Sequence, residues 1–179
     1  MSQLTDIQRS AESAADVVRD AGGRVSGRTR LQKTAYLLEL AGVGVGFSFE
    51  YRNYGPYSEE LATATKAASL FGVVTEEERI TSWGGSLFVF TATGTGTKGC
   101  ESRLALARAA ASAHPVELEL AATAAFLYGE GADDPWAQTA KRKPDKAAAG
   151  RLARAQSLYE KLRMMQTPEG LPMLPPINR

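Results

Sequence analysis

The stretch from Gly94 to Gly99 (GTGTKG) has the G-x-G-x-x-G spacing of a dinucleotide-binding loop, and it follows a predicted strand. In such a site a pyrophosphate lies at the N-terminus of the next helix, and a second, buried parallel strand follows that helix. Residues 116–120 (VELEL) alternate in polarity, whereas a central parallel strand is continuously apolar. Because the surrounding unit is missing, we interpret the stretch as a flexible exit from a hairpin. A nucleotide-using enzyme stays open as an alternative, which thermal stabilisation by a dinucleotide would support.

Other residues with catalytic potential are isolated in the sequence. His114 is the only histidine, which excludes sites that need two or more histidines, and its place before Pro115 is typical of a turn or a helix cap. Cys100 is the only cysteine and has neither a second thiol nor an assigned base beside it. The acidic run 76–78 alternates across a predicted strand, which favours a solvated strand over a cation site. We therefore expect a protein that is not an enzyme and that has no cofactor and no metal.

Two segments carry residue types that are more typical of recognition. Residues 27–33 (GRTRLQK) place a basic, polar face on the first turn of a predicted helix, and residues 51–57 (YRNYGPY) gather three tyrosines and an arginine around a rigid turn. Tyrosine and arginine are preferred anchors of protein interfaces, although these tyrosines could equally staple one helix to another. The predicted partner-binding residues are Arg28, Arg30, Gln32, Lys33, Tyr36, Tyr54, Gly55, Pro56 and Tyr57.

The elements that would position these segments follow from apolar periodicity and from glycine and proline signals. The pattern predicts helices over 5–21, 29–40, 59–71, 100–113, 115–128 and 147–166, with a short helix opening at 134–135. Strand-like alternation covers 47–51, 73–81 and 86–93, residues 54–57 read as a turn, and Gly84–Gly85 signals a hairpin.

Three helices followed by a hairpin is the order of a winged-helix domain. We expect a mainly α (α+β) fold, with a winged-helix-like three-helix core and a β-hairpin wing, followed by a C-terminal helical bundle. We expect one compact domain over residues 5–165, with a winged-helix-like part (5–93) and a helical part (94–165). A proline-rich tail over 167–179, without regular structure, would complete the chain.

Composition narrows the class further. The 179 residues are 44% hydrophobic and 23% charged, which excludes a chain that is disordered throughout, and a single cysteine excludes a disulfide scaffold. No apolar run is long enough for a membrane span, and the N-terminus lacks the basic and apolar regions of a signal peptide. We therefore expect a cytoplasmic protein that does not bind membranes.

Charge placement bears on nucleic-acid binding. A winged helix that reads DNA inserts its third helix into the major groove, but here residues 59–71 carry Lys66 as their only cation beside Glu59 and Glu60. The first wing strand adds three glutamates, and such a surface repels phosphates. Basic residues gather elsewhere, which keeps a winged-helix nucleic-acid-binding regulator as the alternative. These residues are Arg24, Arg28, Arg30 and Lys33, and Lys141, Arg142, Lys143 and Lys146.

The two recognition segments also carry a family likeness. Residues 30–38 (RLQKTAYLL) and 54–61 (YGPYSEEL) resemble the R/K-L-Q-K-x-x-Y and Y-G-P-x-S-x-x-L pattern of Panacea-type domains, a group that includes SocA-like proteins and YwgA-like bacterial proteins. Residues 90–94 (FTATG) resemble the exit from the family's wing, and residues 136–144 (WAQTAKRKP) resemble its late Trp and Lys-Pro region. The likeness covers most of residues 5–165.

The resemblance implies a bacterial antitoxin, because Panacea-type members neutralise varied toxins by direct binding and a SocA-like member is a protease adaptor for its toxin. Neither role is enzymatic. We therefore predict a non-catalytic protein-binding module, antitoxin-like or associated with antiviral (phage) defence. It would act by direct binding of a partner protein, either a cognate toxin or a defence-system component.

Overall fold

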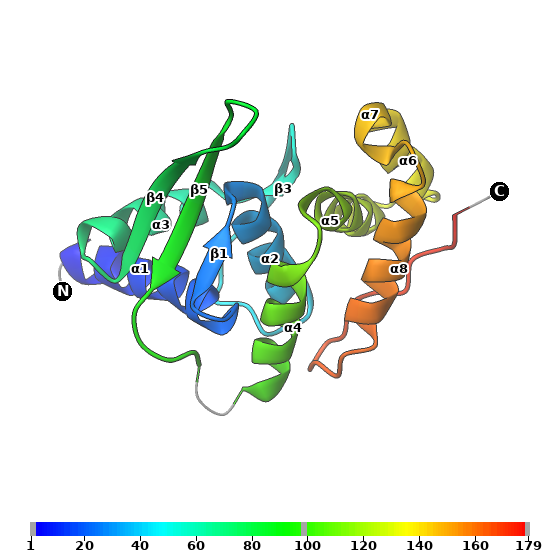
Figure 1. The fold of residues 1–179 in the computed structure, drawn as a ribbon. Helices are drawn as coiled ribbons and strands as arrows, with labels where there is room; N and C mark the ends of the chain where they lie inside the picture. Colours follow the sequence, from blue (N-terminus) through cyan, green and yellow to red (C-terminus); the bar gives the residue numbers. More distant parts are fainter. Residues whose placement is uncertain (1–2, 98–99, 178–179) are drawn as a thin grey trace.

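The computed structural model describes residues 3–97 and 100–177, and helices dominate it (Figure 1). The N-terminal part has three helices and two small antiparallel sheets, and its helices confirm the predicted ones to within a few residues. In chain order its elements are α1 (Gln3–Asp20), β1 (Arg24–Ser26), α2 (Arg28–Leu40), β2 (Glu50–Arg52), β3 (Gly55–Tyr57), α3 (Glu59–Leu70), β4 (Val74–Ile80) and β5 (Ser86–Ala92). The mainly α (α+β) class with a β-hairpin wing is thus confirmed.

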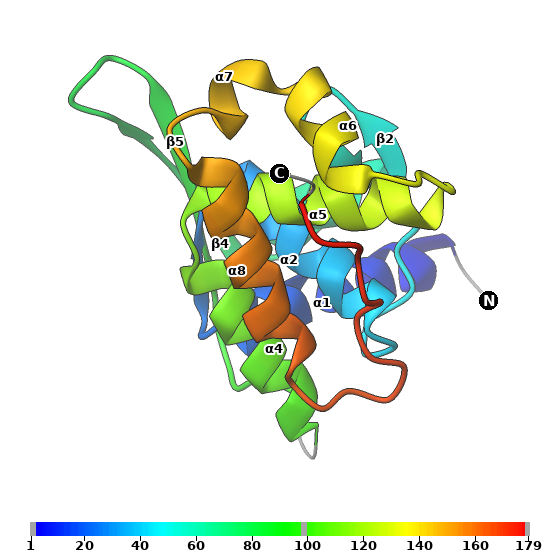
Figure 2. The same cartoon turned by 90° about the vertical axis from the view of Figure 1, so that its right-hand side faces the viewer.

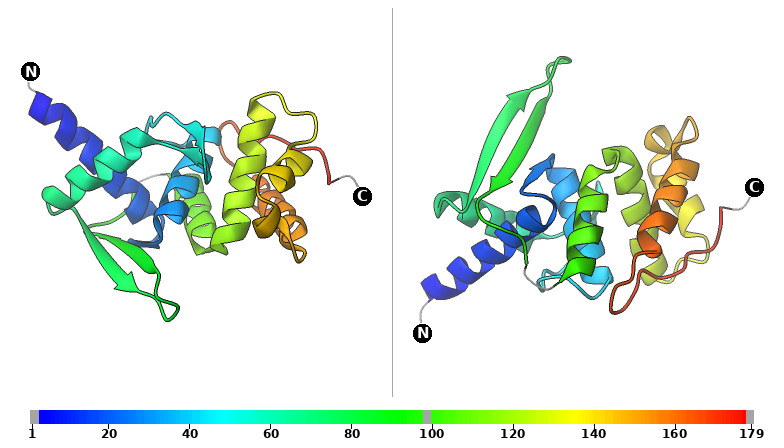
Figure 3. Two further views of the ribbon diagram at one scale, coloured as in Figure 1. Left: turned by 90° about the horizontal axis from the view of Figure 1, so that it is seen from above. Right: turned by 60° about the horizontal axis from the view of Figure 1, so that its bottom comes forward.

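The wing is the hairpin of β4 and β5, and its far end extends beyond the helices (Figure 3). β5 lies between β1 and β4 in the sheet. The register runs from Val74 opposite Ala92 to Ile80 opposite Ser86. Because neighbouring residues of a strand point to opposite faces, Glu76, Glu78 and Ile80 share one face of β4 with Phe88 and Phe90 of β5. The predicted alternation of the acidic run is therefore confirmed.

Two short strands were not predicted. β1 pairs with β5 through only three residues, which is too short for alternation to show in the sequence. Residues 55–57 were predicted as a turn, but they form β3 and pair with β2, with Glu50 opposite Tyr57. A proline is compatible with such an edge strand, because its missing N–H removes no essential ladder bond there. The predicted strand over 47–51 begins only at Glu50.

The C-terminal part is helical. Its elements are α4 (Glu101–Ser112), α5 (Pro115–Gly129), α6 (Pro135–Arg142), α7 (Pro144–Ala147) and α8 (Arg151–Arg163). The middle of α5, from Leu118 to Ala125, is buried, and α8 packs against this helix (Figure 2). α8 begins later than predicted, because Ala149 and Gly150 adopt positive φ angles of 55° and 73° and interrupt the chain.

The chain after α8 has no regular structure over 167–177, as predicted, but it is docked on the protein. Leu171 and Leu174 are buried, and the Tyr159 hydroxyl donates to the Pro172 carbonyl oxygen at 2.8 Å. Figure 2 shows this segment running back along α8. Within residues 3–97 and 100–177, no helix combines the length and apolar character needed to cross a membrane.

Candidate functional site

Arg30, a predicted partner-binding residue, joins two parts of the fold. Its guanidinium donates to the Ala113 carbonyl oxygen at 2.9 and 3.2 Å and to the Ser26 carbonyl oxygen at 2.7 Å. Burial lowers the pKa of Arg30. With three bonds to backbone oxygens, Arg30 ties α2 to the end of α4 and is not free to bind a partner.

The next polar residues of α2 point into the interior. Gln32 exchanges two hydrogen bonds with the backbone of Ser58, at 2.8 and 2.9 Å, and the Lys33 ammonium donates to the Pro56 carbonyl oxygen at 2.7 Å. Tyr36 packs edge to face against Phe49, with ring centroids 5.4 Å apart, and burial raises its pKa. These contacts hold β3 against α2.

The predicted partner-binding surface is therefore not one surface. Five of its nine residues are buried, because β3 and its turn fold over the polar side of α2. They are Gln32, Lys33, Tyr36, Gly55 and Pro56. Arg28 and Tyr57 instead line a groove beside α3, and Tyr54 projects near α6 and α7. Of the tyrosines in this segment, Tyr51 packs against Phe126, whereas Tyr54 is 58% exposed.

Beneath the β2–β3 hairpin lies a cluster of charges that the sequence did not reveal. The buried Glu119 carboxylate accepts from Lys143 at 2.7 Å and from Lys146 at 2.7 and 2.8 Å, and Lys143 also donates to the Asn53 carbonyl oxygen at 3.0 Å. Burial, assisted by the ammonium groups of Lys143 and Lys146 and opposed by Glu119, lowers the pKa of Lys33 to about 7. The cluster fixes the hairpin to α5 and α6.

A groove lies between α3, the start of α2 and the wing. It consists of two adjoining hollows of about 220 Å³ and about 630 Å³, and both are lined by Arg28 and Glu76. The floor of the first hollow includes Leu31 and Phe90, and the second is lined by Phe88, Val74 and Glu78. We call this surface the wing groove.

Large apolar side chains stand exposed beside the second hollow of the wing groove and in the wing turn. Leu70 is 87% exposed at the end of α3, Ile80 is 74% exposed at the end of β4, and Trp83 is 82% exposed in the wing turn. Ser69 and Gly72, on either side of Leu70 in the chain, line the second hollow. Ile80 lies on the same face of β4 as Glu76. Sequence reasoning missed these residues, although a tryptophan beside the hairpin glycines was an available signal.

The remaining candidates for chemistry have structural roles. His114 caps α5 by accepting from the Val116 N–H at 3.3 Å, as predicted. Thr97 donates to the Asp20 carboxylate through its N–H at 2.5 Å and its hydroxyl at 2.8 Å, while Lys98 and Gly99 of the glycine-rich stretch lie outside the described residues. Residues 116–120 belong to α5, so the second strand of a dinucleotide unit is not formed there. In the described part of the chain, no three His, Cys, Asp or Glu residues group as metal ligands.

Comparison with known proteins adds no family. A scan against protein-family models finds no match, and a search of curated proteins finds none either. The resemblance to Panacea-type domains thus stays a prediction that rests on the sequence motifs alone.

Proposed function

We propose that this protein is a non-catalytic module that binds a partner protein through the wing groove and the wing tip. The observation that carries the proposal is the exposure of Leu70, Ile80 and Trp83 around an acidic groove. Exposed aromatic and aliphatic side chains beside a hollow are typical of protein interfaces, whose energetic centres favour tryptophan and arginine.

The charges of the same surface argue against DNA as its ligand. Glu76 and Glu78 line the groove beside Arg28, and Glu59 and Lys66 line its α3 side. On the other face of the wing, Glu77 pairs with Arg79 at 3.0 Å. Because the carboxylates that line the groove outnumber its cations, the groove would not release the counterions that drive DNA binding.

The class of partner follows from the sequence resemblance. A Panacea-type domain would bind a cognate toxin or a component of an antiviral defence system and would neutralise it or deliver it to a protease. We propose that the protein has this antitoxin-like role in the bacterial cytoplasm. The wing groove, and not the surface predicted from residues 28–36 and 54–57, would bind the partner.

The proposal is tested by affinity capture of the tagged protein from its native cytoplasm, with and without nuclease treatment. We expect a stoichiometric protein partner that survives nuclease and is lost when Ile80→Ser and Trp83→Ser are combined. These two side chains are exposed, so the double variant should keep the stability of the wild type within about 0.5 kcal/mol for each substitution.

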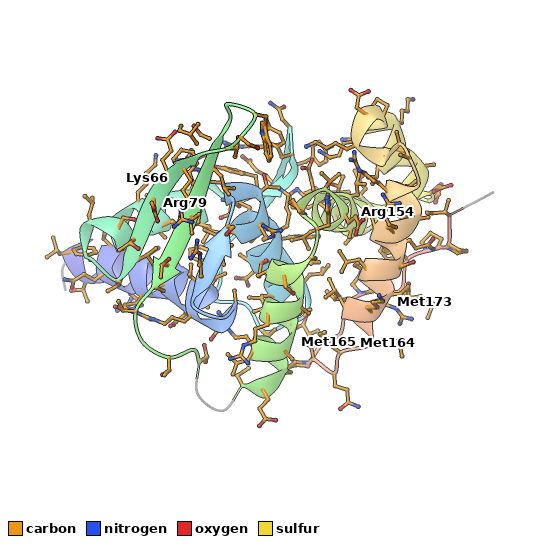
Figure 4. The ribbon with its side chains drawn as sticks, viewed as in Figure 1. Lys66, Arg79, Arg154, Met164, Met165 and Met173 are labelled. Carbon is orange, nitrogen blue, oxygen red and sulfur yellow. The ribbon has the colours of Figure 1, made fainter. Side chains whose placement is uncertain are left out.

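A matched control replaces two exposed methionines elsewhere, Met164→Ser and Met173→Ser. Figure 4 shows Met164 at the lower end of α8 and Met173 in the segment beside that helix, both far from Lys66 of the groove and Arg79 of the wing. The control pair should retain the partner. Equal loss of the partner in both double variants, or no dependence on either, would refute the wing as the binding surface.

One observation favours nucleic-acid binding as a second candidate function, at a different surface. The Lys146 ammonium lies 4.8 Å from the ring centroid of the exposed Tyr54, and the Arg142 guanidinium lies 4.6 Å from that of Tyr51. Cations and aromatic faces that alternate in this way suit single-stranded nucleic acid. Titration with a single-stranded oligonucleotide at two salt concentrations tests this second candidate function. Wild type should bind more weakly at the higher salt concentration, and the double variant Tyr54→Ala, Arg142→Ala should not bind.

A further inference from the structure

Arg28 occupies a position in the wing groove that has the chemistry of a cation-binding site. Its guanidinium carbon lies 3.6 Å from the centroid of the Phe88 ring, and its Nη2 lies 2.9 Å from Oε1 of Glu76. The Glu76 side chain is only 22% exposed, whereas that of Arg28 is 59% exposed. The carboxylate and the ring thus belong to the wall of the groove, while the cation lies at its surface.

A half-buried carboxylate beside an aromatic face suits a cation. The ring attracts a cation through its quadrupole, and the carboxylate accepts its hydrogen bonds. A guanidinium satisfies both at once, because it is planar, stacks on a ring and donates in a fixed fork. A second carboxylate, Glu78, lies on the same face and accepts from the Ser86 hydroxyl at 2.5 Å.

Arg28 holds this position from the solvent side. Its own side chain is 59% exposed, so water partly screens its ion pair with the less exposed Glu76. Arg28 also stands where the two hollows meet, since it lines both of them. If its side chain moved aside, a cation from outside could take the same contacts, and the groove would become continuous.

We infer that the wing groove binds an arginine side chain of the partner, which takes the place of Arg28 against Glu76 and Phe88. The occupant is a basic segment with apolar neighbours, since Glu76 and Glu78 line the second hollow and the exposed Leu70 and Ile80 adjoin that hollow. Arg28 therefore acts as an internal competitor in the free protein. This inference rests on the proposed protein-binding function and names the chemistry of the partner.

The test is a titration with a capped arginine-leucine-arginine tripeptide, followed by NMR of the backbone amides. Its citrulline counterpart has nearly the same shape without the charge and should not bind. We expect shifts at Glu76, Glu78 and Phe88, and an affinity about fivefold higher for Arg28→Ala than for wild type, because the internal competitor is gone.

Matched variants separate the site from general charge. Arg24→Ala removes the same charge from the other face of the sheet, where Arg24 lies opposite Thr91, and it should leave the affinity within about twofold of wild type. Glu76→Gln should abolish binding, while Glu77→Gln on that other face should not. Equal gains for Arg28→Ala and Arg24→Ala, or binding of the citrulline peptide, would overturn the inference. Thermal unfolding of each variant shows that the fold is retained.

Partner capture distinguishes this inference from the proposed function. A partner that requires Ile80 and Trp83 but is indifferent to Glu76→Gln would refute the arginine site and leave the protein-binding function standing. Tripeptide binding with the expected variant pattern, but without any captured protein, would support the site and refute the proposed function.

Discussion

Glu119 and Lys143 form an ion pair of 2.7 Å in which each side chain is only 4% exposed. Lys146 bonds to the same carboxylate, and the field of Glu119 also acts on Lys33. The Glu119 carboxylate thus balances the buried ammonium groups of Lys33 and Lys143 and the partly exposed one of Lys146. A buried charge without a partner is expensive. Two of these lysines also bond to backbone oxygens of the β2–β3 segment, so the position of the hairpin depends on Glu119.

Glu119→Gln should destabilise the protein strongly. The change removes the negative charge and leaves Lys143 and Lys146 facing a neutral amide, which for a broken buried ion pair costs about 3–5 kcal/mol. Urea unfolding of the variant and wild type measures the difference in the free energy of unfolding.

Glu117→Gln provides the control for that prediction. Glu117, on the same helix as Glu119, pairs at 2.8 Å with the more exposed Arg154 of α8, and loss of such a pair costs up to about 1 kcal/mol. Similar losses in the two variants would show that the Glu119 cluster contributes no more than a surface pair does.

Lys33 should make stability rise with pH. Because its folded-state pKa of about 7 lies below the ordinary 10.5, the unfolded chain binds more protons than the folded chain between these two values. The free energy of unfolding therefore increases as pH rises from about 7, by at most about 1.4 kcal/mol per pH unit from this group. Below about pH 7 Lys33 is charged in both the folded and the unfolded state, so the full cost of burying its charge lowers the free energy of unfolding.

Denaturation of wild type and Lys33→Met across about pH 6 to pH 9 measures this effect. The variant lacks both the titrating group and the hydrogen bond to Pro56, so its free energy of unfolding differs from that of wild type at every pH. This difference should change with pH only above about pH 7. Parallel curves over the whole range would mean that Lys33 titrates at its ordinary pKa.

Local patterns predicted the wing and most helices, whereas the interior of the site depended on distant contacts. The strands β4 and β5 lie within twenty residues of each other in the chain, and polar and apolar residues alternate along them. The alternation therefore predicted that Glu76 and Glu78 share one face. In α2, by contrast, every residue from Leu31 to Leu38 is buried, because α4, α5 and β3 all pack around it. Gln32 bonds to both the carbonyl oxygen and the N–H of Ser58, and Lys33 donates to the Pro56 carbonyl oxygen of β3. No spacing in the sequence indicates these bonds.

Tyr159→Phe should loosen the C-terminal segment. The substitution removes the 2.8 Å hydrogen bond to the Pro172 carbonyl oxygen and keeps the ring that packs against Trp136. We expect a loss of about 1 kcal/mol and faster proteolysis within 167–177. Limited proteolysis followed by mass spectrometry measures the cleavage rate. Tyr128→Phe, at an exposed position of α5, should leave that rate unchanged, and equal rates in all three proteins would contradict the docking role of Tyr159.

Gly55→Ala should be far more damaging than Gly72→Ala. Both glycines have positive φ angles, 85° and 72°, so either substitution incurs the strain of an L-residue there, about 1–2 kcal/mol. At Gly72 an added methyl group meets nothing within 4 Å, whereas at Gly55 it would lie 2.3 Å from the Thr123 hydroxyl oxygen of α5. The difference in the free energy of unfolding between the two variants, measured by urea denaturation, isolates this clash. Combining Gly55→Ala with Thr123→Ala should cost less than the sum of the single changes, and strict additivity would show that the hairpin moves away from α5 instead.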